Sequence, residues 1–246
     1  TGSTGMAFEA GASGKNLTEW QFGMASLNPR WNVSGTYMQV LPSFISTDQD
    51  GNDEKEFLLD YFNELPDLLS MVFLKGYQWP FDVNKIFGGS SVIDLLVYQE
   101  TVLKKRRVFL DYRVNPGNLE KDRDLPYASM IPEAKEYLSQ AGACFGTPIE
   151  RLKHMNEPAI LFYQDHHVDL FKERLEIAVC AQHNNGGLST NHLWETNLSG
   201  LYAIGEVCAS HGVTRPGGTA LNAGQVGAVR AAEGIFLKNE LKVSRL

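Results

Sequence analysis

The sequence has too few cysteines for a disulfide framework and no apolar run long enough for a membrane anchor. Its three cysteines, at positions 144, 180 and 208, show neither metal-ligand nor redox-pair spacing, so we expect reduced thiols in a cytoplasmic protein. The longest plausible apolar run, residues 68–74, is far shorter than the roughly 20 residues that cross a bilayer as a helix. We therefore expect no membrane insertion.

Basic residues are also scarce. Lysine and arginine number 22 against 29 aspartates and glutamates, and the resulting net charge of −7 argues against nucleic acid as a partner. The single basic cluster, residues 104–107, lies at the end of a predicted helix, where cations complement the helix dipole. We favour a solvated helix end over an anion-binding site there. The length of 246 residues and the 43% hydrophobic content predict a globular fold of one large or two small domains.

Clusters of metal-ligating residues are missing as well. The acidic segment 48–53 could mimic a calcium loop, but it lacks the distal glutamate and the flanking helices of such loops. Its aspartates, asparagine and glycine favour a plain turn instead. The sequence therefore predicts no metal site.

Strands and helices alternate along most of the chain. Residues 18–21, 37–47, 108–112 and 175–181 are predicted to form strands, because β-forming residues dominate them. Helices are predicted at residues 54–62, 66–75 and 90–103, and three short ones are predicted to open near Pro132, Pro148 and Pro158.

The chemistry of the chain gathers between residues 186 and 234. Residues 201–207 form a short apolar run that predicts a buried strand, with Glu206 at its carboxyl end. Ligands bind at that edge of open α/β sheets, and a carboxylate there can accept hydrogen bonds from both hydroxyls of a ribose. The placement of Glu206 predicts a nucleotide site.

A helix with an almost bare face follows from Thr219. Small residues recur on it at spacings of three and four, which lets the helix backbone approach a sheet or a flat ligand closely. Gly217 and Gly218 precede the helix and leave its first free N–H groups, near Ala220 and Leu221, open to a negatively charged ligand such as a reduced flavin. The small residues are Ala220, Ala223, Gly224, Gly227, Ala228 and Ala231.

Three ordered motifs resemble the FAD domain of the fumarate reductase/succinate dehydrogenase flavoprotein family. Residues 183–187 read His-Asn-Asn-Gly-Gly, and residues 196–206 run from Thr-Asn to Gly-Leu-Tyr-Ala-Ile-Gly-Glu. Residues 211–221 read His-Gly-Val-Thr-Arg-Pro-Gly-Gly-Thr-Ala-Leu. The resemblance implies an α/β fold in which an α+β capping domain is attached to part of a Rossmann-like FAD-binding domain. It divides the chain into three parts. Residues 1–16 are the segment that leaves the FAD domain, residues 17–174 form the capping domain, and residues 175–246 form the C-terminal part of the FAD domain.

The resemblance also implies site residues. Arg215 matches the arginine that binds a substrate carboxylate, a role that suits its rigid two-pronged guanidinium. His183 matches a substrate-binding histidine, whereas for His211 loop packing and an active-site role explain the sequence equally well. The cofactor is expected to be FAD, and the matched cofactor-binding positions are Gly205, Glu206, Gly217, Gly218, Ala220 and Leu221.

The sequence departs from the family pattern in three places. The Gly-x-Gly-x-x-Gly motif that binds the pyrophosphate occurs nowhere, so we expect an N-terminal FAD-binding half as a partner and little FAD binding by these residues alone. Gly23 stands where many members have a substrate-contacting histidine. Residues 88–91, Gly-Gly-Ser-Ser, replace the stretch that supplies the proton-donating arginine, which argues against fumarate itself as the substrate.

These observations predict an FAD-dependent oxidoreductase that exchanges hydride between the flavin and a C–C bond of a small anionic substrate. The flavin would carry the redox chemistry and the protein would supply orientation and electrostatics. Two other hypotheses remain: a substrate-binding capping module, and a non-redox enzyme on the same scaffold.

Overall fold

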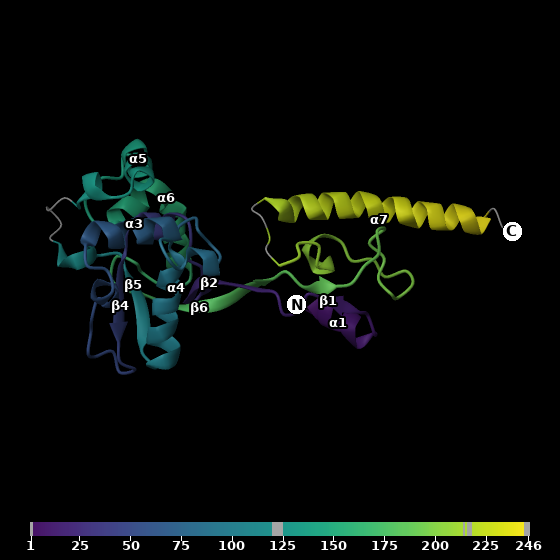
Figure 1. The fold of residues 1–246 in the computed structure, drawn as a ribbon, viewed down its shortest axis with the longest axis horizontal. Coiled ribbons are helices and arrows are strands. Elements are labelled where there is room, and N and C mark those ends of the chain that lie inside the picture. Colours follow the sequence, from purple (N-terminus) through teal and green to yellow (C-terminus); the bar gives the residue numbers. More distant parts are fainter. Residues whose placement is uncertain (1, 120–124, 214, 216–217, 244–246) are drawn as a thin grey trace. The chain divides into compact units, whose positions relative to one another are not determined.

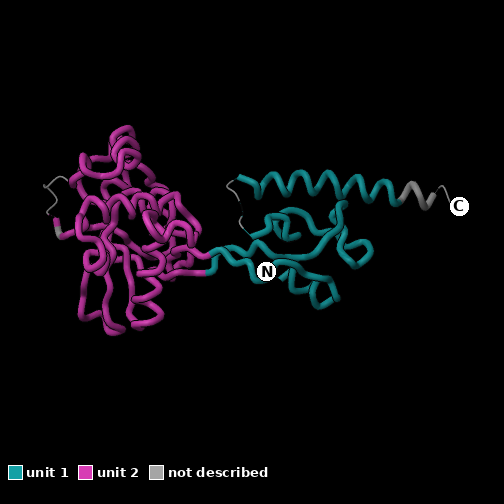
Figure 2. Tube along the Cα trace, viewed as in Figure 1, with its two compact units in different colours: residues 1–21, 181–246 teal, residues 22–180 magenta. Residues whose placement is uncertain are grey.

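The structure is a computed structural model that describes residues 2–119, 125–213, 215 and 218–243. The chain forms two compact units, which Figure 2 distinguishes by colour. Unit 1 comprises residues 1–21 and 181–246, and unit 2 comprises residues 22–180. Helices and strands are mixed along the chain, which confirms the predicted α/β fold class.

Unit 2 is built on a five-stranded sheet with the order β3-β2-β6-β5-β4 (Figure 1). The pairs β2–β3, β4–β5 and β5–β6 are antiparallel, with Phe44 opposite Leu110 and Val108 opposite Ile177. The strands predicted at residues 108–112 and 175–181 are thus present. The bounds are β2 Trp20–Leu27, β3 Arg30–Asn32, β4 Ser43–Thr47, β5 Arg107–Asp111 and β6 Leu175–Asn184.

Helices pack on this sheet through an extensive apolar core. Helix α3 starts with proline in its first turn and buries Leu68, Leu69, Val72 and Phe73. Such a stripe at helical spacing contributes roughly 1.5–3 kcal/mol for each large side chain fully removed from water. The helices of unit 2 are α2 Thr36–Gln39, α3 Leu65–Lys75, α4 Ser91–Tyr98, α5 Pro132–Gln140 and α6 Pro148–Asp165. Short 3-10 or π turns lie at η1 Phe57–Asp60, η2 Val83–Lys85, η3 Gln99–Leu103, η4 Pro116–Asn118 and η5 Tyr127–Ser129.

Two sequence predictions in unit 2 are wrong in part. Residues 36–39 form helix α2 and only Ser43–Thr47 are a strand, because Tyr37, Met38 and Gln39 are all buried against neighbouring helices, whereas a half-exposed strand would alternate. The helix predicted at 54–62 shrinks to η1, since Lys55 pairs with Ser46 as an extended residue. A kink at Asn156 divides α6, and a second helical segment begins just after it with Pro158 in its first turn, as predicted.

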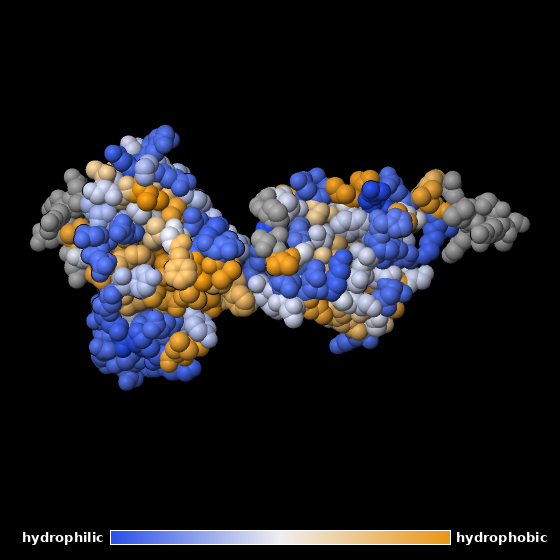
Figure 3. All heavy atoms as spheres, in the orientation of Figure 1, coloured by the Kyte–Doolittle hydropathy of each residue, from blue (hydrophilic) through white to orange (hydrophobic). Residues whose placement is uncertain are grey.

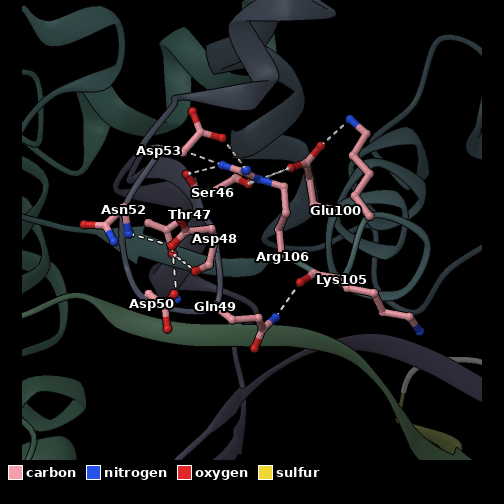
Figure 4. A network of polar contacts seen from close by, with 11 residues as sticks. Ser46, Thr47, Asp48, Gln49, Asp50, Asn52, Asp53, Glu100, Lys105 and Arg106 are labelled. Atoms are coloured by element: carbon pink, nitrogen blue, oxygen red, sulfur yellow. Dashed lines mark hydrogen bonds and ion pairs between the residues drawn. The ribbon is translucent and has the colours of Figure 1, made fainter.

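The acidic segment 48–53 is a turn, as predicted. The Asp48 carboxylate accepts the backbone N–H groups of Asp50 and Asn52 at 3.0 and 2.7 Å, which is the Asx arrangement of a tight turn. Arg106 donates to Ser46 and forms an ion pair with Asp53 at 2.6 Å (Figure 4). The carboxylates around this loop are therefore held by the protein's own donors.

The basic cluster 104–107 is likewise neutralised from within unit 2. Lys104 pairs with Glu100 at 2.6 Å, and Arg107 binds Glu176 through two guanidinium nitrogens at 2.7 and 2.9 Å. These pairs favour the interpretation of a helix end over that of an anion site.

Two buried cations in unit 2 have close polar partners. The Lys75 ammonium lies 2.5 Å from the Asp94 carboxylate, and both side chains are at most 2% exposed. Arg151 is fully buried and donates to the carbonyl oxygens of Val40, Phe145 and Gly146, as well as to an asparagine side chain. Burial lowers the pKa of Arg151 to about 10, which leaves it charged at neutral pH.

Unit 1 has a much smaller core, with residues from α1, β7, η6 and the segments beside them. Its buried members are Ala7, Ala12, Leu188, Ala203 and Cys208. The long helix α7 packs against η6. The helix predicted from Thr219 is present. The bounds are α1 Gly2–Glu9, β1 Gly14–Lys15, β7 Gly187–Leu188, η6 Gly205–Cys208 and α7 Thr219–Val243.

The strand predicted at residues 201–207 is absent from unit 1. Tyr202 pairs only with Glu195 among the described residues, and the chain turns at Gly205, whose φ is +75°, into the 3-10 turn η6. A strand needs neighbouring strands for its backbone groups, and apolar character does not supply them. Glu206 therefore lies in a turn rather than at a strand end.

The small face of α7 packs against protein. A Cβ on Gly227 would approach Trp194 to 3.0 Å, and a Cβ on Gly205 would approach the Gly224 Cα to 3.3 Å. Close approach to η6 and to the segment around Trp194 is thus what the missing side chains permit. Among the described residues, no helix combines the length and apolar character needed to cross a membrane.

Candidate functional site

One carboxylate oxygen of Glu206 is the meeting point of three side chains in unit 1. Arg215 Nη1 lies 3.2 Å from Glu206 Oε1, His183 Nε2 lies 3.5 Å away and His211 Nε2 lies 3.9 Å away. His183 comes from the end of β6, Glu206 from η6, and the other two from the segment before α7. The structure therefore brings together the two residues that the resemblance assigned to the substrate, Arg215 and His183, and also His211, for which the sequence left two roles open.

Two glycines allow these segments to meet. A Cβ on Gly186 would collide with the Asn16 carbonyl oxygen, and a Cβ on Gly187 would collide with the Val207 carbonyl oxygen. Any other residue would push η6 away from the end of β6. The His-x-x-Gly-Gly motif thus places Glu206 beside His183.

Asn185 is a positioning residue that sequence reasoning missed. It is fully buried, its backbone N–H donates to the Glu19 carbonyl oxygen, and its side-chain amide donates to the Val213 carbonyl oxygen at 2.6 Å. The second bond holds the segment between His211 and Arg215 near β6. Its place inside the His-x-x-Gly-Gly motif was the only signal available in the sequence.

A cavity of about 770 Å³ opens beside this cluster within unit 1. His183 and Glu206 line it together with Ser3 and Thr4 of α1 and the ring of Trp20. Its volume is in the range of small-molecule and cofactor sites. Glu206 lines the cavity and is 38% exposed, and its carboxylate also borders the Arg215, His183 and His211 side chains.

Four polar atoms of the cluster are withdrawn from solvent and lack hydrogen-bond partners among the described residues. They are His183 Nε2, His211 Nε2, Arg215 Nε and Glu206 Oε1. Burial lowers the pKa of His183, Glu206 opposes this, and the neighbouring Arg215 and His211 add to the lowering. A neutral His183 can donate one hydrogen bond to a ligand oxygen.

The predicted cofactor positions are only partly assembled around the cavity. Glu206 lines it, but Ala220 and Leu221 are not among its lining residues. Gly218 has a φ of +78° and a Cβ there would meet nothing within 4 Å, so the start of α7 is open. Gly205 is buried against α7, and Gly217 lies outside the described residues.

The two family positions that depart from the pattern lie in unit 2. Gly23 is buried in β2, where a Cβ would collide with the indole nitrogen of Trp79. That nitrogen has no hydrogen-bond partner among the described residues. Ser90 precedes α4 without capping it through its side chain, and Phe87 before it is 91% exposed.

Comparison with known proteins shows which family the chain resembles. Residues 114–221 match the family described as FAD binding domain. A fumarate reductase (CoM/CoB) chain from Methanothermobacter marburgensis is 37% identical over 99 residues, which are 40% of this chain and 18% of that protein. Over this segment, the chain is similar to a fumarate reductase flavoprotein. The resemblance expected from the motifs is thereby confirmed, and FAD is the cofactor that it implies.

Other matches are shorter or more distant. An uncharacterized FAD-dependent oxidoreductase from Methanocaldococcus jannaschii is 45% identical over 60 residues, 24% of this chain and 11% of that protein. A mutated FrdA chain of E. coli quinol fumarate reductase aligns with a TM-score of 0.45 at 20% identity, over 94% of this chain and 35% of its own. A quinol-fumarate reductase structure with menaquinol molecules gives 0.46 and 21% over the same shares. The chain spans less than one fifth of the curated flavoproteins it matches.

The residues of unit 1 suit a flavin nucleotide in chemical type. Glu206 offers a partly exposed carboxylate at a cavity, and the open start of a 25-residue helix offers backbone N–H groups. Within the described part of the chain, no three His, Cys, Asp or Glu side chains are grouped as a metal site requires.

Proposed function

We propose that this chain supplies the cap and the returning part of the FAD domain of an FAD-dependent oxidoreductase. The enzyme would exchange hydride between the flavin and a C–C bond of a small carboxylate substrate. The observation that carries the proposal is the convergence of Arg215, His183 and His211 on a single carboxylate oxygen in a chain related to fumarate reductase flavoproteins.

The substrate would be held by its carboxylate. The guanidinium of Arg215 is a charged fork that suits two-pronged binding of such a group, and its Nε lacks a partner among the described residues. His183, from the end of β6, and His211, from the segment that also carries Arg215, would each add a hydrogen bond to the substrate carboxylate. Together these residues would fix which carbon faces the cofactor.

The FAD would be held at the neighbouring cavity. Glu206 would accept the ribose hydroxyls, while Gly205 would keep η6 close to α7 and Gly217 and Gly218 would leave the helix start open. N–H groups near Ala220 and Leu221 would stabilise negative charge on the flavin ring. When bound, FAD supplies the hydride chemistry. An N-terminal FAD-binding half would provide the pyrophosphate site that the sequence of residues 1–246 lacks.

Fumarate itself would not be the substrate. A histidine in place of Gly23 cannot be accommodated beside Trp79, and residues 88–91 contain no arginine to donate a proton. The same observations favour the second candidate, a capping module or a non-redox enzyme that binds carboxylates on this scaffold. A cytoplasmic location is part of the proposal; it rests on the cysteines, which show neither metal-ligand nor redox-pair spacing.

Flavin content tests the proposal directly. Full-length protein should carry FAD, and Glu206→Ala should lower the flavin retained through purification, whereas Glu195→Ala, whose carboxylate binds Lys238 instead, should retain it. Residues 1–246 alone should retain little. Full-length protein that is colourless, cannot be reconstituted with FAD and still binds succinate would eliminate the redox function in favour of the second candidate.

A further inference from the structure

The carboxylate site of unit 1 is filled by the protein's own carboxylate. Glu206 Oε1 stands within 3.2–3.9 Å of Arg215, His183 and His211, where a ligand carboxylate would have to stand to use the same three groups. Two carboxylates cannot share that position without strong repulsion. A substrate can therefore enter only if Glu206 leaves.

The contacts between Glu206 and these three side chains leave hydrogen bonds unmade, so a ligand carboxylate can readily replace the Glu206 carboxylate. Glu206 Oε1 and both histidine Nε2 atoms are withdrawn from solvent, and hydrogen-bond geometry is not achieved at any of them by described residues. Buried polar atoms in this state raise the free energy of the arrangement. A free carboxylate can orient itself toward these donors, whereas Glu206 is constrained by the 3-10 turn η6.

The Glu206 side chain also has free space beside it. The residue lines the 770 Å³ cavity and its side chain is 38% exposed, so a rotation about its side-chain bonds can carry the carboxylate away from the arginine and the two histidines into the cavity. The proposed function already assigns the ribose hydroxyls of the nucleotide to that place. The two positions of one carboxylate thus belong to two different ligands.

We infer that Glu206 is a latch that couples the two sites. Without the nucleotide, the Glu206 carboxylate contacts Arg215, His183 and His211 and blocks the carboxylate site. When ribose hydroxyls bind Glu206 in the cavity, these three side chains become available to a substrate carboxylate. This inference rests on the proposed function. Since such coupling is reciprocal, a bound carboxylate also strengthens nucleotide binding.

Binding of succinate to residues 1–246 without flavin tests the latch. Titration followed by NMR should give weak binding to the native chain and binding at least about tenfold tighter to Glu206→Gln, because the competing charge is gone. Glu195→Gln makes the same change in net charge in unit 1 but removes a carboxylate paired with Lys238, so it should bind as weakly as the native chain. Glu206→Asp has a shorter side chain, so its affinity for succinate should fall between those of the native chain and Glu206→Gln. This variant serves if the glutamine variant does not fold.

The outcomes separate the latch from the proposed function. If Glu206→Gln and Glu206→Asp bind no tighter than the native chain while Arg215→Met loses binding, the latch is wrong and the carboxylate site stands. If neither the native chain nor either Glu206 variant binds succinate, both ideas fail. In full-length protein, loading with FAD should tighten succinate binding to the native form and leave Glu206→Gln unchanged; equal tightening in both would overturn the latch.

Discussion

Unit 2 and unit 1 differ in how they accommodate buried charged side chains. In unit 2, Lys75 pairs with Asp94 and Arg151 donates to three carbonyl oxygens, although Asp94 Oδ1 lacks a hydrogen-bond partner among the described residues. In unit 1 the Glu206 cluster keeps polar atoms away from solvent without satisfying them. The first arrangement stabilises a fold, whereas the second leaves capacity for a ligand.

The two units also differ in how many apolar side chains they bury. Unit 2 closes a large core, while the core of unit 1 consists of a few small residues beside a cavity. Apolar side chains also lie on the outer surface of α7, where Figure 3 shows them interrupting the polar surface. The most exposed of them are Leu221, Val226, Val229 and Phe236. Unit 1 is therefore the part of the molecule whose stability depends most on what binds it.

Breaking the pair inside unit 2 should have the largest effect on stability. Asp94→Asn leaves the Lys75 ammonium buried without a countercharge, and such a loss costs about 3–5 kcal/mol of unfolding free energy. Both side chains are at most 2% exposed, and this burial lowers the pKa of Lys75 and raises that of Asp94. Denaturant unfolding measures the change.

Two variants control this experiment. Asp67→Asn removes an exposed carboxylate from the same helix as Lys75 and should change stability by less than about 0.5 kcal/mol. Replacing both partners, Lys75→Met with Asp94→Leu, should recover most of the loss, since an apolar pair needs no countercharge. A cost for Asp94→Asn no greater than that of the Asp67 variant would mean that the pair is hydrated.

A smaller effect is expected where β2 meets Trp79. Gly23→Ala places a Cβ against the indole nitrogen and should destabilise unit 2 by about 1–3 kcal/mol, as overpacking of a close-packed site does. Gly5→Ala in α1, where a Cβ meets nothing within 4 Å, is the matched control and should not destabilise the chain. Adding Trp79→Leu to Gly23→Ala should relieve part of the cost. If both alanine variants unfold at the same denaturant concentration, the indole has moved aside.

Elements whose own pattern decides their structure were predictable. Helices α3 and α7 and strand β5 follow from helical spacing, proline in a first turn or a run of β-forming residues. The predictions failed where a distant partner decides: residues 36–39 turn helical under packing from α3, and residues 201–207 find no neighbouring strand among the described residues. Sequence pattern alone does not report such partners.

The site shows the same division. The motifs identified His183, Glu206, His211 and Arg215, but they assigned Glu206 to the nucleotide, His183 and Arg215 to the substrate, and left the role of His211 open. The structure brings the four together around one oxygen, because Gly187 lets η6 approach the end of β6. That approach joins segments about twenty residues apart. Its consequence, one carboxylate serving two sites, could not be derived before the distances were known.

The pH dependence of stability should distinguish the two units most finely. In unit 2, burial raises the pKa of Glu56 to about 7, against a lowering by the Gly117 N–H and a small rise from Asp111. Because the folded pKa lies above the unfolded value, this group's stabilisation is full below about pH 4.5 and is lost as pH rises through about 7. After allowance for partial exposure, the loss is about 2 kcal/mol. Glu56→Gln should remove it.

In unit 1, His183 should act in the opposite direction and more weakly. Its folded pKa is lowered, first by burial and also by Arg215 and His211, with Glu206 opposing, so its stabilisation is present above about pH 6.5 and is lost as pH falls through the folded value. Hydrogen exchange read separately on peptides of each unit, and corrected for intrinsic rates, should therefore show unit 2 gaining protection and unit 1 losing it between pH 7 and pH 5. His183→Asn should flatten only the second trend. Parallel trends in both units, unaltered by either substitution, would show that these buried groups do not set the contrast between the units.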